Sequence, residues 1–106
     1  MIFDHYDLLE LFEREPLEYR SDQGFYMNSK TDPLGIKLLF SMSIYTDKCM
    51  VSLIYKEHEL TLVSLEINNV IKVEKREDLL FIHSKSASSP IIINFKPRFS
   101  ISEICL

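Results

Sequence analysis

Short turns separate the strand-like segments of this chain and leave no room for a crossover helix. In "IKLLFSMSIY" the apolar residues Ile36, Leu38 and Phe40 recur at every second position, which is the period of a β-strand. The turn-like stretches "TDK", "EHE" and "RED" hold only three residues each. Parallel strands need a connection of a dozen or more residues, whereas a tight turn joins antiparallel strands. The sequence therefore predicts an antiparallel meander.

The same alternation predicts six or seven strands in all. Their ranges are 36–45, 49–56, 60–67, 70–75, 79–84 and 91–96, with one or two short strands within 18–28 and a short strand or turn in 98–106. Segments 36–45, 49–56 and 60–67 carry apolar residues on both faces. We therefore expect these three strands to be central in the sheet and covered on each side.

The N-terminal segment predicts one helix, over about residues 4–13. Leu8, Leu11 and Phe12 fall at positions i, i+3 and i+4, so one helix face is apolar. The predicted fold class is α+β and mainly β. It has one N-terminal helix packed on a strongly bent antiparallel β meander of six to seven strands, as a half barrel or a sandwich.

Acidic residues and a proline mark the ends of this helix. Asp4 or Asp7 can act as the N-cap, and Asp7 with Glu10 resembles a capping box. Pro16 disfavours helical geometry at Glu15, so we expect the helix to end near there.

The size and composition predict a single domain over residues 1–106, because 46% apolar residues can fill one core at this length. We expect a cytoplasmic protein. The start of the chain has no basic segment typical of a signal peptide, and no apolar run approaches the length of a membrane helix. Cys49 and Cys105 do not form a disulfide framework, so we interpret both as free thiols.

The negative charge is concentrated at one end of the chain. Residues 1–22 carry seven acidic residues and two arginines, a net charge of −5, whereas the remaining residues carry ten basic and nine acidic groups. Phosphate binding needs the opposite charge, so we expect no nucleic-acid partner, and a basic protein suits this surface better. Acidic residues also suit a helix N-terminus, but that effect fades beyond the first turn.

Patterns that carry chemistry are scarce. Gly24 and Gly35 are the only glycines, so neither a P-loop nor a dinucleotide fingerprint can be written, and we expect no cofactor. No CxxC, HxxxH or HExxH pattern occurs, so we expect no metal site. His5, His58 and His83 are the only candidates for a general base near neutral pH, and we interpret His83 as packed and hydrogen-bonded. We therefore expect no enzyme activity, although spacing alone leaves open a dispersed site.

The run from "LLELFEREPLEY" through the meander to "IIINFKP", in a short acidic chain, resembles the small bacterial immunity proteins that accompany polymorphic toxins. These include the immunity proteins of contact-dependent growth inhibition systems. The resemblance implies a stoichiometric inhibitor that binds the C-terminal toxin domain of its own cell's effector, often a nuclease. Such an inhibitor blocks the active site or the substrate groove of the toxin.

For this chain, the resemblance suggests that the acidic segment competes with a phosphate backbone for a basic toxin surface. Aromatic residues that follow it would serve as anchors, since aromatic residues are enriched at binding hot spots. The predicted toxin-binding residues are Glu10, Glu13, Glu15, Glu18, Asp22, Tyr19, Phe25 and Tyr26.

Three other interpretations stay open. The acids can simply form the solvated face of a helix, and the aromatic residues can simply fill the core. The chain can be a non-catalytic interaction domain, with a sheet edge available for a homodimer. A small-ligand binder or enzyme would instead use a pocket inside the bent sheet near His83 or His58.

Overall fold

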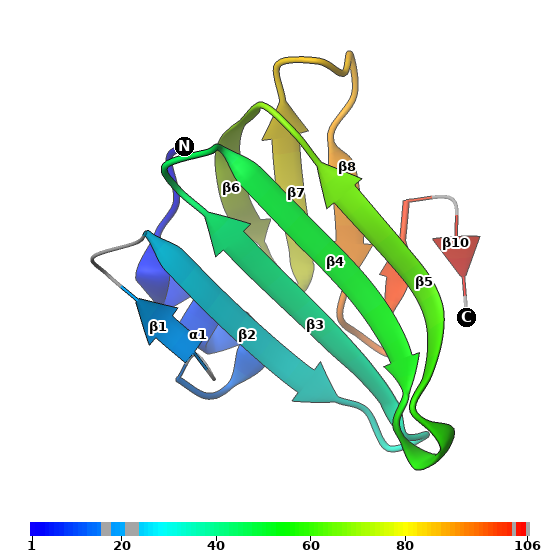
Figure 1. Cartoon of the computed structure of the whole chain (residues 1–106). Coiled ribbons are helices and arrows are strands. Elements are labelled where there is room, and N and C mark those ends of the chain that lie inside the picture. The colour runs from blue at the N-terminus through cyan, green and yellow to red at the C-terminus, as the bar shows by residue number, and fades with distance from the viewer. Residues whose placement is uncertain (16–17, 21–23, 103, 106) are drawn as a thin grey trace.

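A computed structural model of the chain describes residues 1–15, 18–20, 24–102 and 104–105, of which 18–20 and 104–105 are described by their backbone alone. One α-helix, one short 3-10 helix and ten strands lie in these residues (Figure 1). Their bounds are α1 His5–Phe12, β1 Glu18–Arg20, β2 Phe25–Thr31, β3 Ile36–Ser43, β4 Lys48–Tyr55, η1 Lys56–His58, β5 Leu60–Ile67, β6 Val70–Arg76, β7 Leu79–Ser84, β8 Ile91–Asn94, β9 Ser100–Ile101 and β10 Ile104–Cys105.

The strands form two antiparallel sheets in which every neighbour along the chain is also a neighbour in space. The first sheet has the order β1-β2-β3-β4-β5, and the second has the order β10-β9-β8-β7-β6. The predicted meander and the mainly β fold class are therefore confirmed. The described strands outnumber the predicted six to seven because the segments 18–28 and 98–106, where short strands were expected, contribute β1, β9 and β10 of two or three residues each.

Helix α1 begins and ends one residue inside the predicted range. Asp4 is the N-cap, and its Oδ1 accepts a hydrogen bond from the Tyr6 N–H at 2.9 Å. The capping box predicted for Asp7 and Glu10 is absent, because Asp7 lies inside the helix and its Oδ2 is 3.4 Å from the backbone nitrogen of Lys75. Glu13 is the C-cap, in the left-handed conformation with a φ of 59°.

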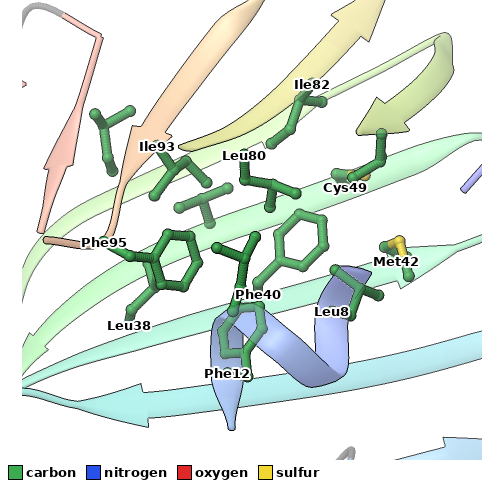
Figure 2. Packing of buried hydrophobic residues seen from close by; sticks show 14 of the residues in the cluster. Leu8, Phe12, Leu38, Phe40, Met42, Cys49, Leu80, Ile82, Ile93 and Phe95 are labelled. Atoms are coloured by element: carbon green, nitrogen blue, oxygen red, sulfur yellow. The ribbon is translucent and has the colours of Figure 1, made fainter. Parts of the chain in front are cut away.

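The helix and the second sheet cover the same face of the first sheet (Figure 1). Leu8, Leu11 and Phe12 are buried on α1 and join a core drawn from both sheets. The ring of Phe12 stacks near Phe40 of β3, at 6.3 Å between centroids, and meets Phe95 edge-on at 5.1 Å (Figure 2). An isolated helix of eight residues is unstable in water, so this burial holds α1 in place.

The other face of the first sheet is covered by no helix or sheet of the described residues (Figure 1). The expectation that segments 36–45, 49–56 and 60–67 are central and covered on both sides is therefore wrong in two respects. β5 is an edge strand, and β3 and β4 are buried on one face only. The apolar residues on their second face reach solvent.

Candidate functional site

The acidic end of α1 is neutralised in part by two lysines from different sheets. Lys75 Nζ of β6 lies 3.1 Å from Glu10 Oε2, and Lys30 Nζ of β2 lies 3.3 Å from Glu13 Oε1. Lys30 also donates a hydrogen bond to the Leu11 carbonyl at 3.2 Å. The lysine side chains are only 19–22% exposed, whereas the two glutamates are at least 60% exposed. These carboxylates therefore neutralise the charges of two largely covered lysine side chains and still face solvent.

A charged cleft of about 250 Å³ lies beside this end of the helix. Its lining residues are Glu10, Leu11, Glu13, Lys30, Lys75, Glu77, Asp78, Phe95 and Lys96. The turn between β6 and β7 brings Glu77 and Asp78 next to the helix. The sequence did not indicate these two residues, because their proximity to the helix depends on tertiary packing. Four carboxylates and three ammonium groups line the cleft, a net charge of −1. Such a lining favours a lysine or arginine side chain of a protein partner.

Of the remaining predicted acids, only Glu15 has a described side chain, and it does not line the cleft. Glu15 is exposed, and its Oε2 lies 3.7 Å from His5 Nε2. Glu18 and Tyr19 lie in β1, where the register pairs them with Met27 and Tyr26, and only their backbone is described. Asp22 lies outside the described residues.

Phe25 and Tyr26 point to opposite faces of the first sheet, because they are adjacent in β2. Tyr26 packs on the core side, with its ring centroid 5.4 Å from that of Phe3 in an edge-on arrangement. Phe25 pairs in register with Ser43 on the uncovered side and is half-buried. The structure therefore separates the predicted aromatic anchors, and only Phe25 is placed on the side opposite α1.

The histidines do not line the charged cleft. His83 Nε2 lies 3.0 Å from Glu74 Oε1, and its ring stacks near Phe81 at 6.2 Å. The ammonium group of Lys72, followed by His83, holds the pKa of Glu74 down to about 2. The predicted packed and hydrogen-bonded His83 is confirmed, and His58 lies at the exposed tip of the β4–β5 hairpin.

Two further observations concern the described part of the chain. No group of three His, Cys, Asp or Glu side chains there could hold a metal ion, and no helix there is long and apolar enough to cross a membrane. Cys49 is a free, buried thiol, and burial raises its pKa to about 12, so it is poorly suited to nucleophilic chemistry.

Comparison with known proteins gives one informative likeness. No protein-family model matches the chain, and no curated protein matches it. Among solved structures, the chain is similar to a chain of the "Contact-dependent growth inhibition toxin - immunity protein complex from Klebsiella pneumoniae 342". The TM-score is 0.78, the likeness covers 92% of this chain and 90% of that chain, and the sequence identity is 18%. At this identity the likeness shows a shared fold.

Proposed function

We propose that this chain is the immunity protein of a contact-dependent growth inhibition system, which binds and neutralises a cognate toxin domain. The observation that carries the proposal is the shared fold with a chain of a toxin–immunity complex, over at least 90% of both chains. The sequence resemblance points to the same class, and it rests on size, acidity and the run from "LLELFEREPLEY" through the meander to "IIINFKP". The protein acts in the cytoplasm as a stoichiometric inhibitor and not as an enzyme.

The toxin is a nuclease with a basic substrate surface, and the acidic segment attracts that surface. Glu10 and Glu13 keep their carboxylates at least 60% exposed while pairing with lysines. Glu77 and Asp78 extend the acidic surface beyond the segment predicted from sequence. Long-range attraction of this kind raises the association rate and weakens with added salt. The bound inhibitor then covers the active site or the substrate groove of the toxin.

The first test uses the C-terminal domain of the protein encoded immediately upstream. Expression of that domain should stop growth of a host cell, and co-expression of this chain should restore it. The purified proteins should form a one-to-one complex whose association slows as salt increases. If the upstream domain is toxic and this chain neither binds it nor restores growth, the proposed function is wrong.

The electrostatic part of the proposal needs neutral replacements. Charge reversal at Glu13 would place a second ammonium group beside Lys30, which is only 19% exposed, and would perturb the fold itself. The double variant Glu10→Gln, Glu13→Gln removes two charges and keeps the side-chain shape. The matched control is Glu57→Gln, Glu59→Gln at the exposed tip of the β4–β5 hairpin.

We expect the helix variant to associate several-fold more slowly at low salt, and the hairpin variant to associate at nearly the wild-type rate. If both variants associated more slowly than wild type by the same factor, only the net charge of the chain would matter. Unchanged rates for the helix variant would remove the acidic segment from the recognition mechanism while leaving the immunity function in place.

A further inference from the structure

The uncovered face of the first sheet is unusually apolar for a surface that faces solvent. Strands with one buried face normally alternate apolar and polar residues, so that the outer face is polar. Here the register places five large apolar residues on the outer side: Phe25, Met27, Leu39, Met50 and Ile54. Met50 is 45% exposed, and the other four are half-buried against their neighbours. We call this surface the outer face.

Small hydroxyl residues separate these apolar side chains across the strands. Ser41 pairs with Met27 on one side and with Met50 on the other. Ser52 pairs with Leu39, and Ser43 pairs with Phe25. Cross-strand partners share a face of the sheet, so each large side chain stands next to a short one. The outer face is therefore corrugated, with raised methionine, leucine and phenylalanine side chains and shallow hollows lined by serine.

Few of the described side chains on the outer face are charged, and one of them, Glu66, is the cross-strand partner of Met50. Lys48 and Glu66 form an ion pair at 3.0 Å at one end, and Lys37 pairs in register with Ile54 toward the other. An apolar centre enriched in methionine and aromatic residues, with charges at the rim, is the usual anatomy of a protein–protein interface. A nucleic-acid surface would instead need basic residues along its length.

The size of the outer face fits a protein partner. Strands β2 to β5 hold seven or eight residues each. With strands about 4.8 Å apart and a rise of about 3.3 Å per residue, they span a projected area of about 500 Å². The accessible area of a corrugated surface exceeds its projection, and a standard interface buries about 800 Å² on each partner.

The geometry points to the outer face as the surface that holds the toxin domain, with Met50, Leu39 and Phe25 as its main apolar contacts. This inference rests on the proposed function. A second copy of the chain is a poorer occupant, because two molecules of net charge −4 repel each other, whereas the toxin's basic surface is attracted. Of the three predicted aromatic anchors, Phe25 is the one with a described side chain on this face.

The test replaces one apolar residue by lysine at two places. Met50→Lys lies on the outer face, where Met50 is 45% exposed and pairs with Ser41 and Glu66, so a lysine there can reach solvent and a carboxylate. Ile71→Lys is the matched control, since Ile71 is 51% exposed on β6 of the second sheet and the charge change is identical. Ser41→Arg, which fills a hollow between Met27 and Met50, is a second variant should Met50→Lys unfold. The probe is the upstream toxin domain, inactivated at its catalytic site.

We expect Met50→Lys and Ser41→Arg to weaken toxin binding at least tenfold, mainly through faster dissociation, while Ile71→Lys stays within twofold of wild type. Wild-type affinity for both outer-face variants would overturn the inference and leave the immunity function standing. A free protein that is a dimer, and that Met50→Lys converts to a monomer, would overturn it in favour of self-association. If the wild-type chain binds no toxin, the proposed function and this inference fail together.

Discussion

Replacement of Phe12 by alanine tests how α1 is held on the sheets. The side chain is 1% exposed and lies near the rings of Phe40, in β3 of the first sheet, and Phe95, the residue that follows β8. Burial and cavity terms for a phenylalanine deleted from a core amount to about 3–5 kcal/mol. The better helix propensity of alanine returns about 0.5 kcal/mol. We therefore expect Phe12→Ala to lower the free energy of unfolding by about 3–4 kcal/mol.

Urea denaturation followed by circular dichroism measures this change. Tyr6→Ala is the matched control, because Tyr6 is an aromatic residue on the same helix and is 72% exposed. Its loss should change the free energy of unfolding by less than about 0.5 kcal/mol. A cost below about 1 kcal/mol for Phe12→Ala would show that the helix is not docked through this ring. Equal losses in the free energy of unfolding for both variants would refute the conclusion that one helix face is buried and the other exposed.

Two further predictions concern polar groups. Because the folded pKa of Glu74 is lowered from 4.5 to about 2, its carboxylate stabilises the fold above pH 4.5 and loses this effect as the pH falls toward 2. The melting temperature of Glu74→Gln should therefore lie below wild type at pH 6 and converge with it near pH 2; a constant gap would contradict this linkage. The Asn28 amide nitrogen is buried, with no hydrogen-bond partner among the described residues. Asn28→Val should therefore raise the free energy of unfolding by about 1–2 kcal/mol in urea denaturation, and a loss would show that the amide has a structural role.

Local periodicity predicted most of the strands and the helix correctly. The alternation at Leu38, Phe40 and Met42 depends only on which side chains reach the core, and these three are fully buried. The positions of the turns also follow from the sequence, because antiparallel neighbours need only a few residues between them. The bounds of β1, β9 and β10 depend instead on the partner strand, so the sequence indicated only short strands somewhere within 18–28 and 98–106.

The layer arrangement could not be predicted from the apolar pattern alone. Apolar residues on both faces of a strand favour a covered strand, but Met50 and Leu39 lie on a face that no described helix or sheet covers. The sequence pattern shows that a side chain is apolar, but it does not show whether the atoms that cover that side chain come from the same chain or from a partner. An interface residue and a core residue therefore give the same signal in the sequence.

The candidate acidic surface was predicted in part for a similar reason. The sequence concentrated the acids in residues 1–22, but the cations that pair with them come from distant strands. Lys30 and Lys75 reach Glu13 and Glu10 only because α1 packs between β2 and β6. Pairing of this kind depends on tertiary packing, so net charge along the chain overstated the free negative charge at the helix.

The charged cleft and the outer face lie on opposite sides of the first sheet, so we expect them to have different physical roles. Packed layers are about 10 Å apart, which is close to the Debye length of 8–10 Å at physiological ionic strength. In the proposed complex, carboxylates at that distance from the outer face make no direct contact with a toxin bound there, so they would act mainly through a long-range attraction that salt weakens. Apolar contacts at Met50 and Leu39 act only at short range and persist at any salt concentration. Under the proposed function, we therefore expect the charges near α1 to govern mainly the association rate, and the outer face to govern the lifetime of the complex.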